Sequence, residues 1–177
     1  MKVTIQAAAL LAVTSLALAA PEMALQTGTT SAVFQRLLSL EGTWTGQATH
    51  DTGSGKTDSG EVTVVYKVTA ARSVLEETLF PGTPHEMVTM YHPDGPRVML
   101  THYCAVQNQP RMTLEPSSDS NVYSFTFSGG TNMHDADLHM HTVRITFVDV
   151  DHITSVWTSM KDGKIASEAR FDLTRKK

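Results

Sequence analysis

The stretch Glu61-Val-Thr-Val-Val-Tyr-Lys-Val-Thr69 is rich in β-branched residues, which favour extended strands. Its apolar side chains at alternate positions are Val62, Val64, Tyr66 and Val68. The stretch 139–149 repeats this alternation with Val143, Ile145 and Phe147. Because successive side chains of a strand point to opposite faces of a sheet, each stretch predicts a strand with one buried face.

Short runs of the same kind continue from Gly42 to the C-terminus, and turn-forming residues separate them. These turns include Thr52-Gly-Ser-Gly55, Pro81-Gly82, Pro93-Asp-Gly95, Gly129-Gly130 and Lys161-Asp-Gly163. The pattern predicts about ten strands, near 43–50, 61–69, 72–80, 85–92, 97–104, 110–115, 121–128, 139–149, 152–160 and 164–174. No helical segments alternate with them, so we expect an all-β fold. Residues 42–177 are predicted to form an antiparallel up-and-down β-barrel, which hides its strand edges by closing.

The segment before the barrel has a different character. Residues 1–19 are interpreted as a signal peptide, because Lys2 precedes an uncharged stretch that ends in a small-x-small pattern at Ala17-Leu-Ala19. The stretch is short and rich in Ala, Thr and Ser, which argues against a transmembrane anchor. Residues 20–41 form an N-terminal segment with one short amphipathic helix over 31–40. We therefore expect a secreted or periplasmic protein.

Composition limits the classes of partner. The chain has 177 residues, a length typical of one domain, and a formal net charge of -4, with 14 Lys and Arg against 18 Asp and Glu. This balance argues against binding to nucleic acid. Cys104 is the only cysteine, which excludes an intramolecular disulfide and any thiolate-rich metal cluster built from this chain alone.

Gly42-Thr-Trp44, the short helix before it, the strand meander and Arg175 after the last predicted strand resemble the calycin superfamily of lipocalins and fatty-acid-binding proteins. Thr101-His-Tyr-Cys104, Asn108-Gln-Pro-Arg-Met112 and His139-Met-His141 resemble, more closely, a group of bacterial secreted lipocalin-like proteins. The resemblance implies a barrel with a ligand-binding lumen. It also implies structural roles for Trp44, which closes one barrel end, and for Arg175, which lies across the indole ring.

Calycin barrels include haem-binding, nitrobindin-like proteins whose axial histidine lies on the last strand. Aligning Leu173 and Arg175 with that pattern places Glu168 at the histidine position. A carboxylate is a poor replacement for an imidazole ligand, so the sequence argues against haem.

Alternation also predicts which polar side chains enter the lumen. Val98, Leu100, His102 and Cys104 share one face of the fifth predicted strand, and His139 and His141 continue the inward face of the eighth. Either Glu76 or Glu77 should point inward, and Tyr66 belongs to the buried face of the second strand. These residues would orient the polar end of a small, partly apolar molecule bound in the lumen. Alternatively, each could be a hydrogen-bonded core residue without a binding role.

Two other functions remain open from the sequence. His139 and His141 could bind copper or zinc, because their spacing places both imidazoles on one strand face near two methionines and two aspartates. A barrel-pocket enzyme could use His102, Cys104 or a luminal glutamate, although the chain contains no hydrolase, metalloprotease or nucleotide-binding motif.

Overall fold

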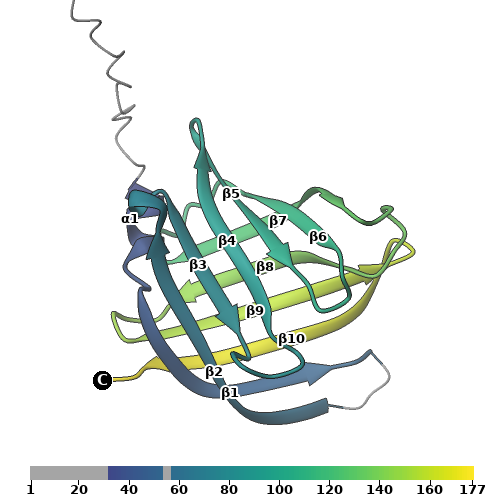
Figure 1. The fold of residues 1–177 in the computed structure, drawn as a ribbon, viewed down its shortest axis with the longest axis horizontal. Coiled ribbons are helices and arrows are strands. Elements are labelled where there is room, and N and C mark those ends of the chain that lie inside the picture. Colours follow the sequence, from purple (N-terminus) through teal and green to yellow (C-terminus); the bar gives the residue numbers. More distant parts are fainter. Residues whose placement is uncertain (1–31, 54–56) are drawn as a thin grey trace, which may run out of the picture.

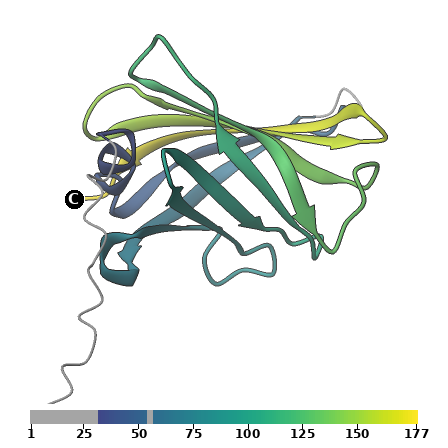
Figure 2. The same cartoon turned by 90° about the horizontal axis from the view of Figure 1, so that it is seen from above.

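The computed structural model describes residues 32–53 and 57–177. Its ten strands form one closed barrel in which consecutive strands pair in antiparallel fashion and the first strand also pairs with the last (Figures 1 and 2). The predicted all-β, ten-stranded up-and-down barrel with a short N-terminal helix is therefore confirmed. The predicted signal peptide over 1–19 lies outside the described residues, as does the predicted start of the helix at Ser31.

The helix and strands begin and end within a few residues of the predicted positions. They are α1 (Ala32–Leu38), β1 (Gly42–Asp51), β2 (Thr57–Thr69), β3 (Val74–Leu79), β4 (Met87–Asp94), β5 (Arg97–Tyr103), β6 (Gln109–Leu114), β7 (Val122–Thr131), β8 (His139–Phe147), β9 (His152–Lys161) and β10 (Lys164–Arg175), with a 3-10 turn η1 (Ala70–Arg72) between β2 and β3. The largest differences are at the start of β2 and the end of β7, which extend into polar sequence. Hydrogen bonding to neighbouring strands holds these ends extended, whereas sequence patterning records only buried faces.

The predicted inward faces match the observed burial. In β2, Val62, Val64 and Tyr66 are buried, and Val68 is half-buried against the core. In β8, the buried set is Val143, Ile145 and Phe147. Within the described residues, no helix is long and apolar enough to cross a membrane.

α1 and the C-terminus lie at the same end of the barrel (Figures 1 and 2). This end is packed with hydrophobic side chains around α1. Phe34, Leu37 and Leu38 of α1 are buried in the same cluster as Trp44. Arg36 of this helix stacks 4.4 Å from the Phe147 ring centroid, and it donates a hydrogen bond of 2.8 Å to the Ser120 carbonyl. The helix therefore caps this end, which we call the closed end.

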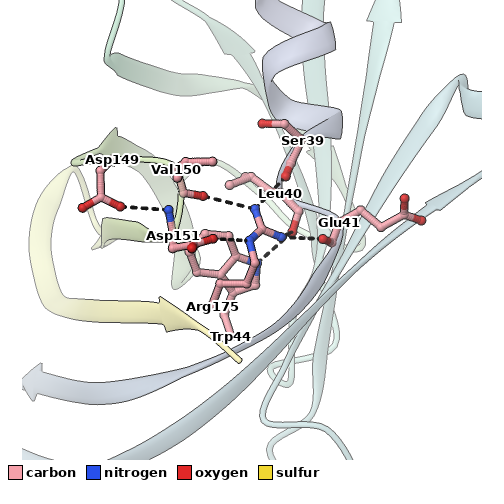
Figure 3. A network of polar contacts seen from close by, with 8 residues as sticks. All are labelled: Ser39, Leu40, Glu41, Trp44, Asp149, Val150, Asp151 and Arg175. Carbon is pink, nitrogen blue, oxygen red and sulfur yellow. Dashed lines mark hydrogen bonds and ion pairs between the residues drawn. The ribbon is translucent and has the colours of Figure 1, made fainter. Parts of the chain in front are cut away.

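Arg175 joins three segments at the closed end (Figure 3). Its guanidinium carbon lies 4.3 Å from the centroid of the fully buried Trp44 ring. The same group donates to the Glu41 carbonyl at 2.6 Å and to the Asp151 carboxylate at 3.0 Å, and the indole nitrogen of Trp44 donates to the Leu40 carbonyl at 2.7 Å. The last strand is thereby tied to the segment after α1 and to the turn between β8 and β9.

Gly46 allows β1 to approach β10 closely. A Cβ atom at this position would lie 1.8 Å from the backbone oxygen of Asp172, a distance that no side chain can occupy. A Cβ atom added at Gly60, on the neighbouring strand β2, would have no other atom within 4 Å. The pairing of β1 with β10, the seam that closes the barrel, therefore requires a glycine at position 46, whereas position 60 in β2 has room for a side chain.

We expect Trp44→Ala to lower the free energy of unfolding by about 3 to 5 kcal/mol, because it removes a buried aromatic ring and leaves a cavity under Arg175. Urea unfolding followed by circular dichroism measures this. Tyr103→Ala is the control, since Tyr103 is 48% exposed and should change stability by less than about 0.5 kcal/mol. Equal effects of the two substitutions would contradict the structural role of Trp44.

We expect Gly46→Ala to lower the free energy of unfolding by at least about 1 to 3 kcal/mol, because the new methyl group forces the backbones of β1 and β10 apart. Gly60→Ala supplies the matched control and should be nearly neutral. The midpoints of thermal unfolding of the two variants measure the difference. A Gly46→Ala protein as stable as the wild type would show that the seam tolerates a side chain.

Candidate functional site

A cavity of about 580 Å³ lies at the end of the barrel opposite α1. Its wall contains residues from the end of β1, the start of β2, the loop between β3 and β4, and the ends of β5 and β8 to β10. Exposed residues at its mouth include His50, Asp58, Thr83, His85 and Val106. The cavity is therefore open to solvent at the end that α1 does not cover.

The cavity wall is mainly apolar. Its larger hydrophobic members are Leu79, Phe80, Met87, Leu138, Met140, Trp157 and Phe171. Ala48 and Ala169 contribute only methyl groups to the wall, and none of the described residues in the wall is Lys or Arg. Such a wall suits an uncharged, largely apolar molecule.

His102 is a fully buried polar residue in this wall. Alternation along β5 points its side chain inward, as the sequence predicts, and its ring packs on that of Trp157 with 4.8 Å between centroids. Its Nδ1 lies 2.9 Å from the Thr89 hydroxyl, while its Nε2 has no hydrogen-bond partner in the described part of the chain. Burial lowers the pKa of His102 to about 4, so the imidazole is neutral at pH 7.

A buried chain of hydrogen bonds continues from His102 into the barrel core. Thr89 also bonds to Glu77, whose two carboxyl oxygens accept hydrogen bonds of 2.7 Å from the hydroxyls of Tyr66 and Tyr91. Burial raises the pKa of Glu77, and the hydrogen bonds from the two tyrosines and Thr89 counteract that rise. This chain connects the cavity wall to a carboxyl group that has no contact with solvent.

The structure decides between the two glutamates that the sequence left open. Glu77 is buried with Leu75 and Leu79, whereas Glu76 lies on the other face of β3 and is only half-buried. Neither glutamate lines the cavity, and Tyr66 does not line it either. The predicted inward carboxylate thus contacts the tyrosines in the core behind the cavity.

Cys104 follows the last residue of β5 and lies in the cavity wall. It is a half-buried free thiol whose sulfur is 3.9 Å from that of Met87. Burial raises the pKa of this thiol, so it is a weak nucleophile at neutral pH. Its position is therefore more suited to lining a cavity than to covalent catalysis.

His139 and His141 contact each other, with 3.1 Å between Nε2 of the first and Nδ1 of the second. The pairing of β8 with β9 shifts register between Met140 and Thr142, which strict alternation does not predict. As a result, His139 is buried and lines the cavity together with Met140, whereas His141 is half-buried and lies outside the wall. Of the predicted ligand-binding residues, the cavity collects His102, Cys104 and His139.

No group of three or more His, Cys, Asp and Glu side chains in the described ranges is arranged to hold a metal ion. His139 Nδ1 is committed to the Asp137 carbonyl at 2.7 Å, which leaves its Nε2 directed at His141. Copper or zinc binding by this pair stays a prediction, since the geometry supplies two ligands where a structural zinc site has four.

Sequence reasoning missed three residues of the site: Thr89, Tyr91 and Trp157. Thr89 and Tyr91 alternate along β4, and both are buried, as is Trp157 in β9. Their alternation could have placed them inside the barrel. It could not have shown that Thr89 lies next to His102, because that contact depends on the register between β4 and β5.

Comparison with known proteins shows the fold alone. No protein-family model and no curated protein matches the sequence. Among solved structures, the chain is similar to Rv2717c from M. tuberculosis, with 12% identity, a TM-score of 0.60, and coverage of 83% of this chain and 99% of that one. It is also similar to a protein of unknown function from the DUF3598 family of Nostoc punctiforme, with 15% identity and a TM-score of 0.57 over 79% of this chain. The match spans about half, 48%, of the Nostoc protein.

We expect the stability of the protein to fall by about 3 kcal/mol between pH 6.5 and pH 4 through His102 alone. In this window the unfolded chain binds a proton at residue 102 and the folded chain does not, so the free energy of unfolding decreases as the pH falls. Urea unfolding at several pH values should show a smaller decrease for His102→Gln, in which the other acid-titrating groups of the protein, such as Glu77, remain. Parallel pH profiles for the two proteins would contradict the depressed pKa.

Proposed function

We propose that this protein binds a small, largely apolar molecule in the cavity at the open end of its barrel. The proposal is supported mainly by one observation: an apolar cavity of about 580 Å³ that contains a buried, neutral histidine with an unpaired nitrogen. Burying the apolar part of a ligand would supply the affinity, at about 25 cal/mol per Å² of surface removed from water. His102, with Cys104 and His139 nearby, would contact the polar part.

Binding is favoured over catalysis by the chemistry of the same residues. A general base works best when its pKa lies near the working pH, whereas the His102 pKa of about 4 makes it a weak base. The raised pKa of Cys104 disfavours the thiolate that a nucleophile needs. These are the properties of a cavity wall that holds its ligand unchanged.

The resemblance to calycin barrels, which hold ligands in the lumen, supports the same proposal. We further propose that the protein acts outside the cytoplasm, because residues 1–19 have the sequence features of a secretory signal. An extracellular or periplasmic binding protein would sequester or carry a molecule that is poorly soluble in water.

Filling the cavity should weaken binding. We expect Ala169→Phe to weaken binding of the uncharged dye Nile red at least about tenfold, because the new ring occupies the space between β10 and the rest of the wall. Dye fluorescence measures affinity. Ala136→Phe, at an exposed loop position outside the wall, is the control and should bind as the wild type does.

The same experiment has a second measurement in Cys104, the only thiol in the chain. Bound dye should slow its modification by a thiol reagent in the folded wild type and should leave the rate unchanged in urea. Dye that binds Ala169→Phe as tightly as the wild type, with no protection of Cys104, would place the binding site elsewhere.

A further inference from the structure

Two neighbouring rings in the cavity wall carry polar atoms without a hydrogen-bond partner among the described residues. These atoms are His102 Nε2 and Trp157 Nε1. The two rings are buried, their centroids are 4.8 Å apart, and both rings line the cavity. A buried polar atom without a partner costs about 1 to 3 kcal/mol, so a ligand group that pairs with these atoms gains affinity at this point of the wall.

The hydrogen bonds behind His102 determine what its free nitrogen can do. The hydroxyls of Tyr66 and Tyr91 both donate to Glu77, which makes the Glu77 carboxylate the acceptor in this cluster. Thr89 has one proton, and its bond to Glu77 uses that proton. The Thr89 oxygen therefore accepts from Nδ1–H of His102, and Nε2 carries a lone pair. The His102 ring, which belongs to the cavity wall, thus carries a free hydrogen-bond acceptor at Nε2.

Trp157 presents the opposite polarity, because an indole N–H can only donate. An acceptor and a donor on adjacent rings match a ligand group that both donates and accepts. A hydroxyl group does both through a single oxygen atom.

The charges around the cavity exclude an anionic group. None of the described wall residues is Lys or Arg, and two carboxylates, Asp58 and Glu61, belong to the wall near its mouth. A third carboxyl group, Glu77, lies behind His102 and is reached through Thr89. A ligand carboxylate would lose its hydration without gaining a counter-charge, which is costly in an apolar cavity.

We infer that the ligand is an uncharged, hydroxyl-bearing apolar molecule whose hydroxyl group donates to His102 Nε2 and accepts from Trp157 Nε1–H. This inference rests on the proposed function and specifies its ligand class. It separates the protein from barrels that select fatty-acid anions, because the residues that contact the polar end here are a neutral histidine and an indole.

Three probes with the same alkyl chain test the inference: 1-decanol, its methyl ether and decanoate. Each competes with Nile red for the full-length protein at pH 7.5. The ether can accept but not donate, so decanol should bind about five- to tenfold more tightly, as expected for one added hydrogen bond. Decanoate is ionised and should bind at least tenfold more weakly than decanol.

Two variants give different signatures. His102→Phe removes the acceptor, so decanol affinity should fall to that of the ether while ether affinity stays unchanged. Trp157→Phe removes only the donor, so decanol and ether should weaken together and their ratio should persist. His92→Phe, a histidine in β4 outside the cavity wall, is the matched control and should retain the wild-type order of affinities. If His102→Phe does not fold, Trp157→Phe and the wild-type series still decide the outcome.

The inference is overturned if decanoate binds as tightly as decanol, if the ether does so in the wild type, or if His102→Phe keeps the preference for decanol. In each of these cases a ligand still binds, and the proposed function stands. Failure of all three probes and of Nile red to bind would instead overturn the proposed function itself.

Discussion

The stacking of Arg175 on Trp44 connects the last strand of the barrel, β10, to the first strand, β1. Arg175 is the last residue of β10 and pairs with Trp44 in β1, so the contact lies on the seam where the sheet closes. The guanidinium keeps its hydrogen bonds to Glu41 and Asp151 while its flat face covers the indole. Arginine suits this position because a planar cation can stack on a ring and donate at its edges at the same time. Closure here removes the last free strand edges and leaves the opposite end free to form a cavity.

The two ends of the barrel therefore differ in what fills them. Side chains from α1 and Trp44 pack the closed end, while small residues such as Ala48 and Ala169 leave space at the other. Between them lies the hydrogen-bonded group of Tyr66, Glu77 and Tyr91. A buried carboxyl group is tolerated there because each of its oxygens has a donor. Through Thr89, the same group fixes which nitrogen of His102 carries the proton.

This arrangement gives the cavity a defined polarity without placing a charge in it. The histidine is neutral because it is desolvated, and its orientation is held by Thr89 on one side and Trp157 on the other. In the function that we propose, such a wall would discriminate between ligands by hydrogen-bond direction and would disfavour ions, because it does not replace their hydration. The likeness to Rv2717c and to the Nostoc protein, at 12% and 15% identity, shows the barrel fold and carries no information on the residues of the cavity wall.

The sequence alone determined the fold class, the number of strands and the inward faces, because alternation of apolar residues and turn chemistry are local properties. It placed His102 in the lumen correctly for the same reason, and it narrowed the buried carboxylate to Glu76 or Glu77. Only the tertiary structure decided the rest. The register between β4 and β5 brought Thr89 to His102, the irregularity in β8 left His141 outside the cavity wall, and barrel closure set Trp157 against the His102 ring. The contacts of His102 with Thr89 and Trp157 join residues that are 13 and 55 positions apart in the sequence. A local sequence pattern shows which face of a strand is buried, but it does not show which residue of another strand lies opposite.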